Sequence, residues 1–134
     1  MKRIAKVLLT ILALLLLIQF IGTNKVNQPV NPEQNFVQIN KTPANITTML
    51  KAACYDCHSN ETVYPGYANY APISWFIADR VNEGRKYLNF SIWSTYNQDQ
   101  KNTIIERVAE TVEINRMPLP SYISKHPEIG RAHV

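Results

Sequence analysis

The first strong pattern in the chain is an apolar run that follows a short basic start. Lys2, Arg3 and Lys6 lead into residues 7–21, which are almost all aliphatic or aromatic. Such a run predicts a helix that is either a secretory signal or a retained membrane anchor. No small-X-small cleavage motif follows the run, and no cysteine near it offers a lipid anchor. We therefore expect residues 1–22 to remain as a single-pass transmembrane helix.

Apolar periodicity is weak in the next segment, residues 23–44. This segment is rich in Asn and Gln and contains Pro29, Pro32 and Pro43. That composition is typical of an extended linker. We expect a flexible tether here, joined to a folded domain over residues 45–134.

Helical periodicity appears after the tether and predicts three amphipathic helices. They cover residues 45–54, 71–84 and 97–115. The apolar positions that share one face within each helix are Ile46, Met49, Leu50 and Ala53; Ile73, Phe76, Ile77 and Val81; and Ile104, Ile105, Val108, Ala109 and Val112. The spacing predicts an all-α domain in which these faces meet.

Length and charge narrow the class of protein. The chain has 134 residues, which is enough for one small domain behind an anchor. Its formal net charge is +4, and the basic residues are scattered along the sequence. A scattered charge of this size does not indicate a nucleic-acid partner.

The residues with the clearest chemistry are Cys54-Tyr55-Asp56-Cys57-His58, which include both cysteines of the chain. Two cysteines at this spacing, followed by histidine, predict covalent attachment of a c-type haem. Cys54 and Cys57 are about one helical turn apart, so both sulfurs can reach the vinyl groups on one porphyrin edge. His58 can then give an imidazole nitrogen to the iron. A redox-active dithiol or a metal site is the alternative, but a thioredoxin-like site would sit in a βαβ context that the sequence lacks.

The predicted location agrees with this chemistry. The positive residues before the apolar run place the amino terminus in the cytoplasm and the domain outside it, which in a bacterium is the periplasm. A thioether bond persists in that oxidising compartment, and the chain has no further cysteine left to pair there. The localisation expected is therefore the inner membrane, with the haem domain in the periplasm.

The sixth iron position has a candidate near the end of the chain. Met117 follows the third predicted helix, in the proline-rich stretch 116–122. A soft thioether on a backbone stiffened by proline suits axial ligation, so we expect Met117 to be the distal ligand. His126 and an open or water-ligated iron are the alternatives, and Met49 is expected in the core, although it could also ligate. His133 lies close to the chain end.

Other residues near the predicted site are expected to have structural roles. Arg80, Arg85 and Lys86 either are solvated or pair with haem propionates, and the solvated interpretation is the simpler one. Trp93 lies in a short linking segment and is expected to pack in the core or against the ring.

The ordered motifs resemble the haem-binding domain proteins of bacteria, a membrane-anchored group of the cytochrome c type. The stretches that carry this resemblance span nearly all of the exported part and are residues 54–62, 71–75, 83–85, 88–91 with Trp93, 117–119 with 121–122, and 126–127. The resemblance implies a small cytochrome c-like helical domain around one haem c. It assigns Cys54 and Cys57 as thioether sites, His58 as proximal ligand and Met117 as distal ligand.

The sequence departs from the resemblance at its end. Members of the group continue past the His-Pro pair into a further helix, whereas this sequence ends at Val134. We expect a domain that is shortened at its carboxyl end or closes differently, with lower stability or a wetter haem.

Three functions follow from this interpretation. The first is one-electron transfer between redox partner proteins, because two filled axial positions leave little room for substrate and no general acid or base stands out beside the cysteines. The second is a haem sensor or a peroxidase-like enzyme with an open sixth position. The third is a haem-bearing accessory subunit of a larger complex.

Overall fold

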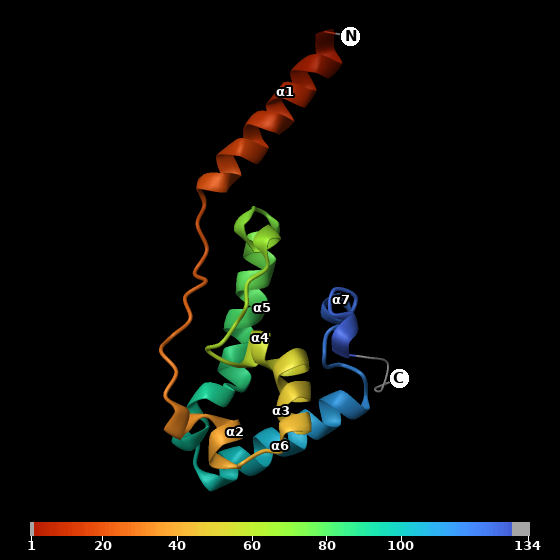
Figure 1. The fold of residues 1–134 in the computed structure, drawn as a ribbon. Helices are drawn as coiled ribbons and strands as arrows, with labels where there is room; N and C mark the ends of the chain where they lie inside the picture. The colour runs from red at the N-terminus through yellow and green to blue at the C-terminus, as the bar shows by residue number, and fades with distance from the viewer. Residues whose placement is uncertain (1, 130–134) are drawn as a thin grey trace. The chain divides into compact units, whose positions relative to one another are not determined.

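The computed structural model describes residues 2–129, and within that range the chain forms helices and no strand (Figure 1). The all-α prediction is therefore confirmed for the described part of the chain. Two compact units make up the fold. The first combines residues up to Val26 with Tyr64–Arg80, and the second combines Asn27–Val63 with the residues from Val81 onward.

The first unit contains the predicted apolar helix. Helix α1 spans Lys2–Leu17 and continues as a 3-10 turn, η1, over Ile18–Phe20. Together they are long and apolar enough to cross a membrane, and none of the residues of α1 is buried by the rest of the protein. The unit is completed by η4, Gly66–Asn69, and by the first part of α5, Ile73–Tyr87.

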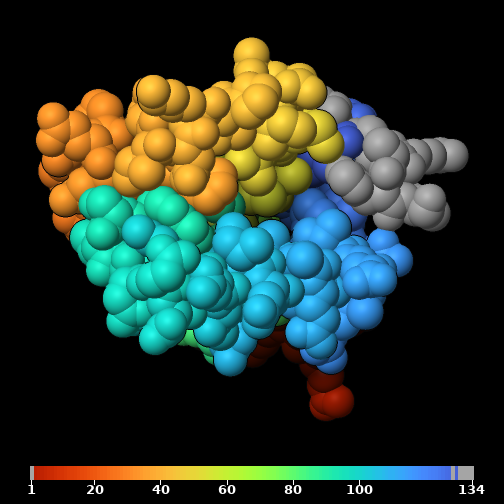
Figure 2. All heavy atoms as spheres, turned by 90° about the horizontal axis from the view of Figure 1, so that it is seen from below, coloured from red at the N-terminus to blue at the C-terminus, as the bar shows by residue number. Residues whose placement is uncertain are grey.

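The second unit contains the remaining helices and the last turns of α5. In chain order they are η2 (Pro32–Gln34), α2 (Phe36–Ile39), α3 (Ala44–Leu50), the π-helical η3 (Lys51–Tyr55), α4 (Asp56–His58), η5 (Phe90–Thr95), α6 (Gln98–Glu113), α7 (Pro120–Ile123) and η6 (Pro127–Ile129). Residues 27–50, in orange and yellow, lie directly against residues 88–115, in teal and blue (Figure 2).

Aromatic side chains dominate the core of this unit. Tyr55 and Phe90 stack with their ring centroids 5.0 Å apart and 7° between their planes. Trp93 meets Phe36 edge-on at 4.9 Å, and Val37 completes the cluster from α2. Trp93 is therefore a core residue, which confirms one of the two roles expected for it.

The prediction of a flexible tether is wrong for residues 32–39. Asn35 and Val37 are buried, and Phe36 packs against the core. The Asn35 side chain also accepts a bond of 3.2 Å from the backbone N–H of Val37, which starts α2. Two adjacent apolar residues in a one-turn helix are too few to produce periodicity, so composition alone suggested a linker. The boundaries at residues 22 and 44 stay predictions.

The three predicted helices are present, but some of the apolar positions that were expected to be buried are exposed. Helix α6 begins with a capping box in which Asn97 and Gln100 bond reciprocally. In contrast, Met49 is 48% exposed and Ile105 is 46% exposed, although both were assigned to buried faces. Periodicity identifies the apolar side of a helix but not how much of that side a neighbour covers.

Candidate functional site

The predicted haem-attachment residues lie at the end of one continuous helical run formed by α3, η3 and α4. Cys54 is in the π-helical turn, and Cys57 and His58 are in the turn that follows. The π turn directs Tyr55 into the core, where it is only 3% exposed. The two cysteines and His58 are half-buried. Single π turns are frequent at functional sites, and this one was not predicted by the sequence.

The His58 ring is oriented by two backbone carbonyls. Its Nδ1 is 2.9 Å from the carbonyl oxygen of Gly84 and 3.2 Å from that of Leu88. Because a carbonyl only accepts, Nδ1 carries the proton and donates, which leaves the lone pair on Nε2. Burial lowers the pKa of His58 although the two carbonyls oppose that effect. The result is a neutral imidazole, the form that binds iron.

Gly84 permits α5 to approach closely the helical run of α3, η3 and α4, called here the attachment run because it contains the predicted haem-attachment residues. A Cβ atom at this position would overlap the carbonyl oxygen of Cys57 and lie 3.2 Å from the Cys57 Cβ. The close approach also brings the Gly84 carbonyl to His58. A glycine within a helical pattern is the signal that could have indicated this contact from the sequence.

The pKa of the Cys54 thiol is shifted in the opposite direction from the pKa of a redox-active Cys-X-X-Cys thiol. Burial raises its pKa to about 11, and the neighbouring Cys57 adds to the effect. Reactive Cys-X-X-Cys sites depend on a lowered thiol pKa. The βαβ arrangement of such sites is also missing from residues 2–129. Both observations oppose the dithiol alternative.

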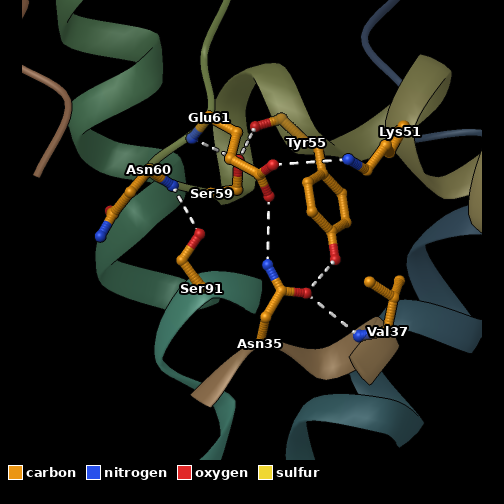
Figure 3. Close-up of polar contacts among 8 residues, drawn as sticks. All are labelled: Asn35, Val37, Lys51, Tyr55, Ser59, Asn60, Glu61 and Ser91. Carbon is orange, nitrogen blue, oxygen red and sulfur yellow. Dashed lines mark hydrogen bonds and ion pairs between the residues drawn. The ribbon is translucent and has the colours of Figure 1, made fainter. Parts of the chain in front are cut away.

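A buried polar network fixes the residues directly after His58 (Figure 3). The Ser59 hydroxyl, fully buried, donates to the Tyr55 carbonyl at 2.7 Å. The Asn60 N–H donates to the Ser91 hydroxyl at 2.9 Å, and Asn89 donates from its amide to the Asn60 side chain at 2.8 Å. Buried polar groups that are all bonded specify one geometry, so this network fixes where the helical run ends.

A second part of the same network joins α2 to the run. The Tyr55 hydroxyl donates to Asn35 at 3.0 Å, and the Asn35 amide donates to Glu61 at 3.1 Å (Figure 3). Glu61 also pairs with Lys51 at 3.4 Å. Asn35 falls in the segment predicted to be a linker, and no role was predicted for Glu61, so these partners were missed. Their polar side chains gave no periodic signal.

Arg85 is half-buried and bonded to other protein groups, whereas the preferred expectation was a solvated side chain. Its Nε donates to the Ser59 carbonyl at 2.8 Å, and Nη2 donates to the Thr62 hydroxyl at 2.9 Å and to the Asn27 side chain at 2.5 Å. Planar guanidinium groups suit several acceptors at once. Arg85 therefore holds the 59–62 segment in place.

Met117 lies in the loop between α6 and α7 and is 38% exposed. Its backbone N–H bonds to the Thr111 carbonyl at 3.1 Å. In the following helix, α7, the Tyr122 hydroxyl is 3.0 Å from the Ala52 carbonyl and 2.9 Å from an Asp56 carboxylate oxygen. The chain just beyond Met117 is thus attached to the run that holds the cysteines. Ligation by Met117 stays a prediction.

The other ligand candidates have different surroundings. His126 stacks on Tyr122, with ring centroids 3.9 Å apart. Met49 is on the surface of α3. His133 lies outside the described residues.

Comparison with known proteins gives one match. The family model described as "haem-binding domain" matches residues 13–131, whereas no curated protein and no solved structure matches the chain. The matched stretch contains Cys54, Cys57, His58 and Met117 and covers most of the sequence. The resemblance inferred from the motifs is therefore confirmed, and the chain belongs to the haem-binding domain family.

Proposed function

We propose that the protein is a membrane-tethered, periplasmic c-type cytochrome that carries single electrons on one haem. Cys54 and Cys57 would hold the haem c through thioether bonds, and His58 and Met117 would be its axial ligands. Haem binding follows from the family, whereas covalent attachment, ligation and electron transfer are the parts proposed.

The observation that carries the proposal is the orientation of His58. Its Nδ1 donates to the carbonyls of Gly84 and Leu88, so Nε2 is the nitrogen available to iron. A histidine ligand in a metal site is commonly fixed in this way, with its second nitrogen bonded to a backbone oxygen. The tautomer and the ring direction are then set before the iron arrives.

The surroundings of the cysteines fit a covalently bound haem. Cys54 and Cys57 are three positions apart in one helical run, and their side chains are half-buried. Neutral thiols at this spacing suit addition to two vinyl groups on one porphyrin edge better than disulfide exchange.

The residues around the proposed haem would keep its surroundings fixed while the iron changes its oxidation state. A bound haem supplies a one-electron couple through its iron. His58 stays neutral, and its hydrogen bonds to two carbonyls make it a stronger electron donor to the metal. The network of Ser59, Asn60 and Ser91 keeps the His58 segment in one geometry in both oxidation states.

Attachment to the membrane would limit the redox partners that the haem can reach. If α1 is retained, the basic residues in its first turns keep the amino terminus in the cytoplasm, and the haem-bearing residues lie in the periplasm. The partners proposed are redox proteins of the membrane and the periplasm.

The test of the ligand set is the absorption spectrum of the chain made in a host with the c-type maturation machinery. A low-spin haem with the weak red band of methionine ligation is expected, and Met117→Ala should remove that band. Met49→Ala is the matched control, because Met49 is a similarly exposed methionine on α3. An unaltered low-spin spectrum in Met117→Ala would contradict ligation by Met117.

The exposure of Met117 favours one second candidate, a haem sensor or a peroxidase-like enzyme. A ligand on a partly exposed loop is displaced more easily than a buried one. A covalent but high-spin haem in the unmodified protein would support this candidate over the electron carrier. Co-purification in one assembly with other redox proteins would instead support an accessory subunit.

A further inference from the structure

Large apolar side chains are exposed together in the first unit. They are Tyr67, Tyr70, Ile73 and Phe76, which come from η4, from the turn after it and from the first turn of α5. Tyr70 is 66% exposed and Phe76 is 68% exposed. Large apolar side chains exposed this close together in the chain indicate a contact with another protein or a membrane.

Hydrogen bonds fix this surface to the chain directly after the apolar helix. The Gln19 amide donates to the Ala71 carbonyl at 3.1 Å, and the Ala71 N–H donates back to the Gln19 side chain at 2.9 Å. The Trp75 indole N–H donates to the Ile21 carbonyl at 3.2 Å. The apolar surface therefore begins where a membrane-crossing α1 would leave the hydrocarbon.

Polar groups limit the apolar surface on its far side. Asp79 and Arg80 are exposed about one helical turn beyond Phe76, which is only about 6 Å along a helix axis. A second charged group, Lys25, is bonded to the segment itself and donates to the Ala68 carbonyl at 2.9 Å and to Asn69 at 2.6 Å. Exposed aromatic side chains next to charged ones have the composition of a membrane-interface belt.

We propose that residues 67–76 are a second membrane contact, seated in the headgroup region of the bilayer that α1 crosses. The occupant is phospholipid, because residues 67–76 are bonded to the end of a helical segment that is apolar from Val7 onward, apart from Thr10 and Gln19, and α1 has no buried residue. The Trp75 N–H is already bonded, so its ring can enter an apolar layer without leaving a donor unsatisfied. This inference rests on the proposed retention of α1.

Photo-crosslinking of the full chain in its own membranes tests the contact. The photoreactive residue p-benzoyl-phenylalanine replaces Tyr70 or Phe76 in separate variants, and Tyr87 in the control. Tyr87 is 71% exposed on the same helix but belongs to the second unit. We expect lipid adducts at positions 70 and 76 and none at 87. Adducts to another protein or to a second copy of the chain, or no adduct at 70 and 76, would overturn the proposal.

A charge placed in the surface supplies a second measurement. Phe76→Glu should reduce the lipid adduct at position 70 several-fold, because a carboxylate is poorly accommodated at the apolar boundary. An undiminished adduct would count against an interfacial position for Phe76.

The mass spectra also separate this inference from the anchor on which it rests. An intact chain that includes residues 1–22 but carries no lipid at positions 70 and 76 would overturn the second contact alone. A chain cleaved after the apolar run would overturn both the anchor and the second contact.

Discussion

Gly84 affects both the packing of α5 against the attachment run and the orientation of His58, the proposed iron ligand. Its missing side chain leaves room for the Cys57 carbonyl, and its own carbonyl accepts from His58. A single methyl group would therefore affect both the packing of α5 and the hydrogen bond to the imidazole.

Gly84→Ala should destabilise the protein. Alanine favours a helix by up to about 1 kcal/mol over glycine, but overpacking at a rigid contact costs about 1–3 kcal/mol, so the clash with Cys57 outweighs the gain. The measurement is a urea titration of the detergent-solubilised chain, followed through haem absorbance. Gly66→Ala is the control, since nothing lies within 4 Å of a Cβ placed there. Equal loss in both variants, or none in Gly84→Ala, would show that the close approach is unimportant.

The Cys54 thiol should be slow to react in the folded chain before haem is attached. Its pKa is raised to about 11, so the neutral thiol persists at neutral pH and the thiolate forms only as the pH rises toward that value. A shift of about two pH units from the ordinary value predicts roughly 100-fold slower alkylation than for an unperturbed cysteine at pH 7.

Alkylation of the haem-free chain by iodoacetamide, read by mass spectrometry, measures this rate. The same chain in urea is the control, because unfolding removes the burial and restores the ordinary pKa. Fast labelling of Cys54 at pH 7, in a chain that keeps its helical circular dichroism, would contradict the raised pKa and support the redox-active dithiol instead.

Among the helices, α7 is short and depends on side-chain contacts for its position. It has one turn, Pro120–Ile123, and no residue in it is buried. Tyr122 connects it to the attachment run through Ala52 and Asp56. The Tyr122 hydroxyl therefore helps to position the Met117 loop relative to that run.

Tyr122→Phe should loosen α7 without unfolding the domain. Loss of a side-chain hydrogen bond costs about 1 kcal/mol, and this change removes the donor from two acceptors. Hydrogen exchange should become faster in residues 118–126 and stay unchanged in α6. Tyr87→Phe, at an exposed tyrosine, is the matched control. Unchanged exchange after Tyr122→Phe would mean that other contacts hold α7.

The helices also show how far sequence reasoning extends. Helix α6 was predictable because periodicity, length and the Asn97 cap all indicate the same element. A helix over residues 45–54 was predicted to lead into Cys54, because apolar residues recur at helical spacing along it. The π turn was not predicted, since a one-residue insertion in the hydrogen-bond pattern leaves no mark in apolar spacing.

The parts of the site that the sequence did not predict are long-range polar contacts. Asn35 reaches Tyr55 and Glu61 from a segment that composition assigned to a linker. Arg85 donates to the Ser59 carbonyl, although its side chain was expected to be solvated. Which polar groups bond over such long distances in the sequence depends on the tertiary fold. Cys54, Cys57 and His58 were recognisable because their chemistry depends only on their spacing in the sequence.

At the scale of the whole molecule, the two units have different roles in this account. The first contains the apolar helix and the exposed aromatic residues, and the second contains Cys54, Cys57, His58 and Met117. Attachment to the membrane and binding of haem are therefore assigned to separate sets of contacts. A variant that disturbs one set should leave the other intact.

The central claim is that haem is bound covalently through Cys54 and Cys57 in a protein whose family binds haem. The most direct measurement is the intact mass of the denatured chain, made in a host with the c-type maturation machinery. We predict a chain heavier by one haem, with the added mass lost when Cys54 and Cys57 are both changed to Ala. A denatured chain that carries no haem, or a double variant that still retains it covalently, would contradict the account.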